Sequence, residues 1–199
     1  MIGRVGRQAK VLTPGDLRKL LALAGRGRFP ERDRVMVLLA VRAGLRAREI
    51  AGLSWGMVLD ANGRVGSVID VRAAIAKRRS GRRVPMHPQL HKALLVCRDL
   101  QSAGNLQPDA VIIRSLKGGP MRAKSIVNWF IANCRLAGLE GCSSHSGRRT
   151  FITRAARAAH RAGASLRDVQ MLAGHRSIET TQGYIDGDTD AQRRLVRAL

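Results

Sequence analysis

Long apolar runs are missing from this sequence. None of its 199 residues lies in a run of the about 18 apolar residues that a membrane-spanning helix needs. The N-terminal segment MIGRVGRQAK is basic but lacks the apolar core of a secretory signal. We therefore expect a soluble protein of the cytoplasm with no membrane partner.

Cysteine is scarce and irregularly placed. Cys97, Cys134 and Cys142 are an odd number without regular spacing, which argues against a disulfide framework and for a reducing compartment. Cys134, Cys142 and His145 could contribute to a zinc site, but no CxxC or HxxxH pair offers a fourth ligand. The glycine-rich segment 116–122 lacks the spacing of a phosphate-binding loop. The sequence thus predicts no metal and no cofactor.

Acidic residues are few beside basic ones. Lysine and arginine number 36 against 14 aspartates and glutamates, which gives a formal net charge of +22. A charge of this size repels itself unless a polyanion accepts it, so a nucleic acid is the expected partner. A general bias toward arginine is the alternative explanation. Such a bias would replace lysine by arginine more readily than it would create a surplus of positive charge.

Apolar residues recur mostly at helical spacing, over a length that suits one domain. A period of two appears only at residues 65–71 and 82–86, which we expect to form a hairpin with a turn at Ser80 and Gly81. Residues 111–114 are a candidate third strand. The expected fold class is mainly α with a small antiparallel β-sheet (α+β). Helices are expected at residues 14–24, 31–43, 88–100, 125–137, 144–161 and 177–185, after residues 46 and 165, and within 186–199.

Several helix ends carry their own signals. Thr13 and Asp16 form a capping-box pattern, and Ser165 and Asp168 repeat it. Gly44 suits the left-handed position that follows a helix. These signals fix where three helices begin or end.

Residues 144–185 concentrate the polar side chains that are best suited to chemistry. His145 and Arg148 are three residues apart, so on a helix they lie on one face and could address one ligand together. Both are hydrogen-bond donors, and a phosphate suits such a pair better than a protein core does. His175 follows a glycine, and Tyr184 is the only tyrosine in the chain.

Each of these residues has an ordinary structural explanation when it is judged alone. Both histidines could be hydrogen-bonded residues at helix ends, and the tyrosine could belong to the core. Arg46 could form a local ion pair with Glu49 one helical turn away. Lys77 could be a solvent-facing lysine on an edge strand.

The order and spacing of these residues resemble the catalytic domain of the tyrosine recombinases, the phage-integrase family. The resemblance extends from about residue 12 to residue 185 and needs five elements in one order, which makes it more specific than any single motif. The elements are GLRAREIAGLSW at 44–55, Lys77 seven residues before Val84 and Pro85, HxxR from His145 to Arg148, AGH at 173–175, and Tyr184 nine residues after His175.

The resemblance implies how the matching residues would bind a scissile DNA phosphate. Arg46 and Arg148 would clamp its non-bridging oxygens, a task for which two planar, permanently charged guanidinium groups are suited. His145 and His175 would donate further hydrogen bonds or transfer protons.

The resemblance also implies the chemistry. Tyr184 would attack the phosphorus, leaving a 3′-phosphotyrosine and a free 5′-hydroxyl. Lys77 would protonate the departing 5′-oxygen, and Glu49 would support the site by orienting an arginine or a histidine. This chemistry requires no metal and no ATP.

Two positions depart from the family's pattern. Arg149 follows the HxxR element where a histidine is common, and Gly147 stands where a larger apolar residue is usual. Gly147 should weaken the start of its helix by about 1 kcal/mol relative to alanine. Because neither change touches a residue that would contact the phosphate, we expect catalytic competence.

The expected domain organisation follows from the extent of the resemblance. Residues 1–11 would be a basic flexible arm, residues 12–185 the catalytic domain, and residues 186–199 a tail helix that docks on a neighbouring protomer. We expect no N-terminal core-binding domain, so the chain is either a short recombinase similar to the fimbrial-switch invertases or a fragment of a longer protein.

The leading hypothesis is a site-specific DNA recombinase of the integrase or invertase type. It would act at the nucleoid on double-stranded DNA, as a homo-oligomer (a tetramer) on paired sites. The alternatives are a non-catalytic DNA-binding accessory protein of the same fold and a type IB topoisomerase-like activity. An arginine-rich RNA-binding protein would explain the charge but not the ordered motifs.

Overall fold

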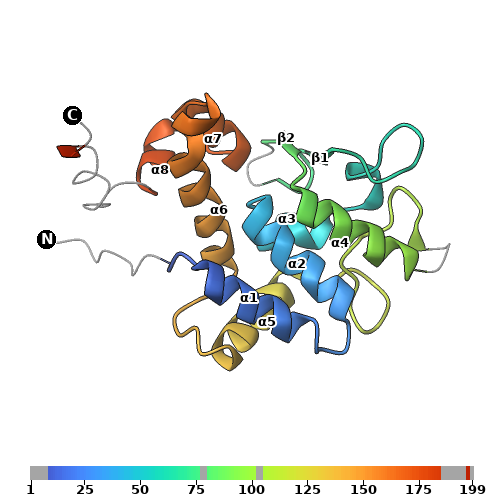
Figure 1. Ribbon diagram of the computed structural model, residues 1–199. Coiled ribbons are helices and arrows are strands. Elements are labelled where there is room, and N and C mark those ends of the chain that lie inside the picture. The colour runs from blue at the N-terminus through green and yellow to red at the C-terminus, as the bar shows by residue number, and fades with distance from the viewer. Residues whose placement is uncertain (1–8, 77–79, 102–104, 185–195, 198–199) are drawn as a thin grey trace, which may run out of the picture.

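The computed structural model describes residues 9–76, 80–101, 105–184 and 196–197 (Figure 1). Most of the expected N-terminal arm lies outside these residues, as do Lys77 and nearly all of the expected tail helix at 186–199. Within the described residues, no helix combines the length and the apolar character that crossing a bilayer requires.

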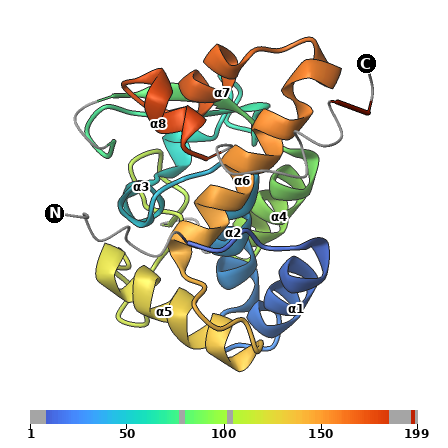
Figure 2. The same ribbon diagram turned by 90° about the vertical axis from the view of Figure 1, so that its left-hand side faces the viewer.

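One buried helix organises the larger part of the molecule. Helix α2 (Pro30–Arg42) is buried at every residue from 35 to 41, as expected of a helix that is apolar on all sides. It packs against α1 (Pro14–Ala24), α4 (Pro88–Asp99) and α6 (Ser144–Ala159), which surround it in Figures 1 and 2. Helix α5 (Ala123–Leu136) closes this layer against α1, α3 (Ala47–Gly52) and α6.

The C-terminal helices form a smaller layer at one end of α6. Helix α7 (Leu166–Ala173) packs on α6, and α8 (Ile178–Gln182) packs on α7. Both views show α7 and α8 at the end of α6 that is far from α1 and α5 (Figures 1 and 2). Short 3-10 helices also lie at Trp55–Met57 and His160–Ala162.

The sheet has two strands, β1 (Val68–Val71) and β2 (Arg82–Pro85), paired antiparallel with Val71 opposite Arg82. The mainly helical fold with a small antiparallel sheet is thus confirmed. The expected two-residue turn is wrong, because backbone hydrogen bonds from residues 75 and 76 to the Arg72 carbonyl form a turn directly after β1. The connection therefore runs from residue 72 to residue 81.

The expected third strand at residues 111–114 is also wrong. Val111 and Arg114 make only isolated bridges, to Ser54 and Pro120 respectively. Ile112 and Ile113 between them are both fully buried, so this segment lacks the alternation of a strand with one exposed face.

The helix ends follow the sequence signals. Thr13 and Asp16 exchange capping-box hydrogen bonds of 2.9 and 3.1 Å, and Ser165 and Asp168 do the same at α7. Gly44 has φ +65°, as expected for the residue after α2. Helix α8 is shorter than expected: it ends at Gln182, so Tyr184 lies just beyond its last turn.

Gly147 is a packing residue. A Cβ atom at this position would lie 2.8 Å from the Ala40 Cβ atom, so α6 approaches α2 more closely than any side chain at residue 147 would allow. The weakened helix start that the sequence suggests is therefore offset by tight contact with the central helix.

Buried apolar residues form two clusters. The large cluster lies around α2 and extends over α1 to α5 and the sheet. The small cluster consists of Ile152, Ala159, Val169 and Ala173, with Phe151 and Tyr184 among the residues packed against it. The candidate site described next lies where these two clusters meet.

Candidate active site

Arg148 joins the two clusters. Its guanidinium group donates hydrogen bonds to the Gly44 carbonyl (2.5 Å), between α2 and α3, and to the Ala173 carbonyl (2.6 Å), at the end of α7. The residue is only 4% exposed. Burial, together with the charge of Arg46, lowers the pKa of Arg148 to about 10, so the group remains cationic at neutral pH.

Arg46 stands at the start of α3, where its conformation is fixed by Glu49. The Arg46 backbone N–H donates to Glu49 Oε2 (2.9 Å), and one of its guanidinium nitrogens donates to Oε1 (3.0 Å). The local ion pair that spacing suggested is therefore present. The Arg46 side chain is 24% exposed, whereas Glu49 is fully buried.

Arg82 is a site residue that sequence reasoning missed. It opens β2 and forms a two-pronged ion pair with Glu49, with N–O distances of 2.9 and 3.0 Å. Its Nε atom also donates to the Leu172 carbonyl (2.8 Å) at the end of α7. The available signal was strand alternation, because Arg82 shares its face of β2 with the buried Val84.

Among the residues that the structure describes, Glu49 is the one acidic side chain bonded to Arg46 and Arg82. Burial by itself would raise the pKa of Glu49, but hydrogen bonds and charge from Arg82, and then from Arg46, hold it below its ordinary value. Glu49 is consequently a carboxylate at neutral pH. Three guanidinium groups and one carboxylate leave an excess of positive charge at the site.

His175 is held in place through its backbone. Helix α7 ends at Gly174, whose φ of +62° turns the chain toward His175. The buried side chain of Gln170 donates to the His175 carbonyl (3.0 Å), and the His175 N–H donates to the Gln170 carbonyl (3.1 Å). The imidazole Nδ1 lies 3.0 Å from the Thr181 hydroxyl oxygen, which links it to α8.

Tyr184 lies against this imidazole. The two ring centroids are 5.3 Å apart with an interplanar angle of 26°, a stacked arrangement. The guanidinium carbon of Arg149, a residue of α6, lies 5.5 Å from the centre of the Tyr184 ring. Arg149, noticed in the sequence only as a departure from the family's pattern, thus borders the tyrosine directly.

The imidazole of His175 is neutral in this setting. Burial lowers its pKa, and the charges of Arg148, Arg46 and Arg82 lower it further, to about 4. A neutral imidazole can accept a proton, and an anion bound among the arginines would favour its charged form.

The remaining predicted residues are less closely joined to this group. His145 is exposed in the first turn of α6, one turn before the buried Arg148. Lys77 lies outside the described residues. The structure therefore brings together Arg46, Glu49, Arg148, His175 and Tyr184, and adds Arg82 and Arg149.

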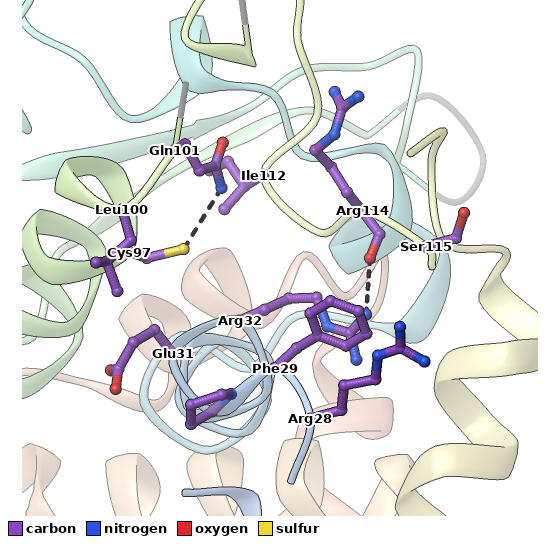
Figure 3. Close-up of a pocket in the computed structure, with 11 residues that line it drawn as sticks. Arg28, Phe29, Glu31, Arg32, Cys97, Leu100, Gln101, Ile112, Arg114 and Ser115 are labelled. Carbon is purple, nitrogen blue, oxygen red and sulfur yellow. Dashed lines mark hydrogen bonds between the residues drawn. The ribbon is translucent and has the colours of Figure 1, made fainter. Parts of the chain in front are cut away.

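A separate cavity of about 350 Å³ lies at the opposite end of α2 from Gly44 (Figure 3). Residues from the start of α2, the end of α4 and the segment 112–115 line it, and none of them is a predicted site residue. Phe29 is covered there by the guanidinium group of Arg32, 4.3 Å from the ring centre. Among the described residues, no group of histidine, cysteine, aspartate or glutamate side chains is arranged to hold a metal ion.

Known proteins with similar sequences are tyrosine recombinases. The chain is 30% identical over 187 residues to tyrosine recombinase XerC of Brucella melitensis biotype 1, a match that covers 90% of this chain and 55% of that protein. It is 31% identical over 182 residues to tyrosine recombinase XerD of Pseudomonas putida, covering 88% and 56% respectively. The chain thus spans little more than half the length of these relatives.

Solved structures show the same fold. The XerA recombinase crystal structure has a TM-score of 0.73 at 22% identity and covers 100% of this chain and 66% of its own. A lambda integrase (75–356) dimer bound to a COC′ core site has a TM-score of 0.65 at 18% identity, covering 92% and 61%. Residues 10–190 also match the family model described as the phage integrase family. This match covers most of the chain and contains every element of the site, and the chain therefore belongs to the phage integrase family.

Proposed function

We propose that this chain cleaves and rejoins DNA strands in site-specific recombination, through a covalent bond between Tyr184 and a DNA phosphate. The observation that carries the proposal is the position of a tyrosine and a neutral imidazole beside three guanidinium groups, two of which, those of Arg46 and Arg82, share the Glu49 carboxylate. An excess of buried positive charge next to a nucleophile suits attack on a phosphodiester, whose own negative charge repels nucleophiles. The names of the relatives support the same reaction.

The proposed reaction exchanges one phosphoester for another. The Tyr184 oxygen forms a bond to phosphorus while the bond from phosphorus to the 5′-oxygen breaks, which leaves a 3′-phosphotyrosine. The tyrosine proton passes to a neutral acceptor, a role that we assign to His175, and the 5′-oxygen takes a proton that we assign to Lys77. Attack by a 5′-hydroxyl on the phosphotyrosine reverses these steps and reseals a strand.

The arginines would act on the phosphate oxygens. Arg46 is partly exposed and has one guanidinium nitrogen bound to Glu49, and we assign its remaining N–H groups to the incoming phosphate. Arg148 lies deeper and contributes its charge while holding the Gly44 and Ala173 carbonyls. His145, at the exposed start of α6, would add a hydrogen bond to the same phosphate.

The partners and the domain organisation belong to the same proposal. Residues 12–185 would be the catalytic domain, acting on double-stranded DNA at the nucleoid as a tetramer on paired sites. Residues 186–199 would dock on a neighbouring protomer. Removing them should impair assembly on DNA more than the stability of the monomer, which sedimentation of the DNA complexes and thermal unfolding can compare.

A trapping experiment tests the reaction. A nicked duplex loses the short fragment that carries the 5′-hydroxyl after cleavage, so the covalent intermediate accumulates and is seen on a denaturing gel. We expect an adduct with the wild-type protein and none with Tyr184→Phe, which keeps the ring but removes the attacking oxygen. DNA binding without any adduct, on substrates drawn from the surrounding genome, would favour the non-catalytic alternative.

A further inference from the structure

Arg82 connects the three elements that carry the site. Its side chain is 6% exposed and donates to both oxygens of Glu49 on α3 and to the Leu172 carbonyl on α7, while its backbone belongs to β2. Figure 1 shows β2 beside α7, and the two elements are in contact. A lysine could not make these bonds together, because only a guanidinium group presents a rigid fork of donors.

The ion pair with Arg82 determines how Glu49 interacts with Arg46. Both Glu49 oxygens accept from Arg82, and the Arg46 guanidinium group shares only one of them, at 3.0 Å. Without Arg82, the fully buried carboxylate would have Arg46 as its nearest cation. Glu49 would then hold Arg46 with both oxygens, and the charge that should meet the phosphate would be neutralised.

A second group of contacts fixes the end of α7. Arg82 bonds the Leu172 carbonyl, and Arg148 bonds the next carbonyl along, that of Ala173. Gly174 follows, and a Cβ atom there would lie 3.0 Å from Arg82 Cδ, so the glycine makes room for this side chain. His175 comes directly after Gly174. The contacts of Arg82 with this end of α7 therefore help to fix the position of the His175 side chain.

We propose that Arg82 is a positioning residue for strand cleavage: it neutralises Glu49 so that Arg46 stays available to the phosphate, and it fixes the end of α7 that delivers His175. This inference rests on the proposed function. Arg82 itself is too deeply buried to be the group that the DNA meets first.

The first test replaces the charge without removing the side-chain stem. Arg82→Met should lower the single-turnover rate of adduct formation at saturating DNA by about 100-fold, the loss expected when reacting groups are displaced by about 1 Å. Arg83→Met is the matched control, because Arg83 is the next residue on β2, carries the same charge and faces solvent. The control should keep the wild-type rate. Equal losses in both variants would overturn the proposal.

A double variant distinguishes this role from a general packing role. Arg82→Met combined with Glu49→Gln removes the carboxylate that would capture Arg46, so the double variant should form the adduct faster than Arg82→Met alone. A residue that merely supported the fold would give a double variant no faster than Arg82→Met, and that result would contradict the proposal. If Arg82→Met does not fold, Arg82→Lys serves instead, and a wild-type rate in that variant would overturn the role of the fork.

Phosphate binding tests the inference without any DNA chemistry. In the wild-type protein, inorganic phosphate should shift the NMR titration of the His175 imidazole upward, because an anion favours its protonated form. The shift should be smaller in Arg82→Met and unchanged in Arg83→Met. If the wild-type protein forms no DNA adduct but the phosphate-induced shift is reduced only in Arg82→Met, the proposed function fails, while the role of Arg82 in positioning the anion-binding groups stands. A shift as large in Arg82→Met as in the wild-type protein rejects that role.

Discussion

His175 is a neutral side chain kept neutral by its neighbours. Its pKa of about 4 lies below its ordinary value of 6.5, because of burial and of the charges of Arg148, Arg46 and Arg82. The unfolded chain therefore binds more protons than the folded one between these values. The contribution of His175 to folding stability is complete above about pH 6.5 and is lost as the pH falls toward 4.

One substitution tests the direction of this pH dependence of folding stability. In urea unfolding between pH 7.5 and pH 4.5, His175→Gln should flatten part of the decrease in unfolding free energy that the wild-type protein shows. The comparison uses the difference between the two profiles, so other titrating groups cancel. Parallel profiles would mean that His175 is not the group responsible.

The close packing of Gly147 predicts how a substitution there changes the free energy of unfolding. Alanine is the better helix former, yet at this position its methyl group would lie 2.8 Å from Ala40 Cβ on a rigid buried helix. We expect Gly147→Ala to lower the free energy of unfolding by about 1 kcal/mol, since overpacking outweighs helix propensity. Thermal or urea unfolding measures the change.

Gly15→Ala is the matched control for that measurement. Gly15 also lies in a helix, and the nearest atom to its added Cβ would be 3.7 Å away, an ordinary contact. This variant should be as stable as the wild-type protein or slightly more stable. Destabilisation of both variants by the same amount would refute the packing role of Gly147.

At the scale of elements, the link between α2 and α3 depends on Gly44. Its φ is +65°, and an added Cβ atom would overlap the ring of Phe151, which belongs to the small cluster. The Gly44 carbonyl also accepts from Arg148. Gly44→Ala should therefore destabilise the protein by more than the about 1–2 kcal/mol that a left-handed alanine costs by itself.

Gly163→Ala distinguishes backbone strain from the clash with Phe151 as the cause of destabilisation in Gly44→Ala. Gly163 has φ +66°, but no atom lies within 4 Å of its added Cβ, so this substitution carries only the backbone strain. We expect Gly44→Ala to unfold at a lower urea concentration than Gly163→Ala. Equal midpoints would show that the contact with Phe151 contributes nothing.

The elements were largely predictable because their signals are local. Capping at Thr13 and Ser165 and the glycine at residue 44 depend on neighbours within one turn, and the structure confirms them. The segment 111–114 was misread because a short buried run does not reveal its pairing. Its bridges depend on Ser54 and Pro120, which no local pattern connects to it.

At the scale of the whole molecule, the net charge of +22 predicts the behaviour of its complexes. Each phosphate neutralised by a lysine or arginine releases condensed counterions, so log K should fall with log salt concentration by about 0.9 per contact. Fluorescence anisotropy with a labelled duplex measures this slope. Tyr184→Phe should keep the wild-type slope because it changes no charge, and a flat response in the wild-type protein would contradict the role of the charge.

The two hydrophobic clusters predict unequal local stability. The small cluster has four buried residues, whereas the large one includes the part of α2 from residue 35 to residue 41, which is buried throughout. Hydrogen exchange should therefore be faster for the amides of α7 and α8 than for those of α2. Mass spectrometry of peptides from both regions tests this, and equal protection would indicate that the molecule unfolds as one unit.

Sequence reasoning named most residues of the candidate site but not the contacts that hold them. Arg46, Arg148, His175 and Tyr184 belong to ordered motifs, whereas Arg82 acts through contacts with distant segments. Arg82 meets Glu49 across 33 residues of sequence, and Arg148 meets Gly44 across 104. Alternation along β2 could indicate that Arg82 faces inward, but only the folded chain shows that it meets Glu49.

The candidate site is divided between the two hydrophobic clusters. Arg46 and Glu49 lie on the side of the large cluster, while His175 and Tyr184 lie on the side of the small one. The hydrogen bonds of Arg82 and Arg148 to the Leu172 and Ala173 carbonyls connect the two sides. An interface held by so few hydrogen bonds can open without unfolding the cluster on either side. A partner that binds α7 and α8 would therefore change the separation of Arg46 from His175 and Tyr184 without altering any of these side chains.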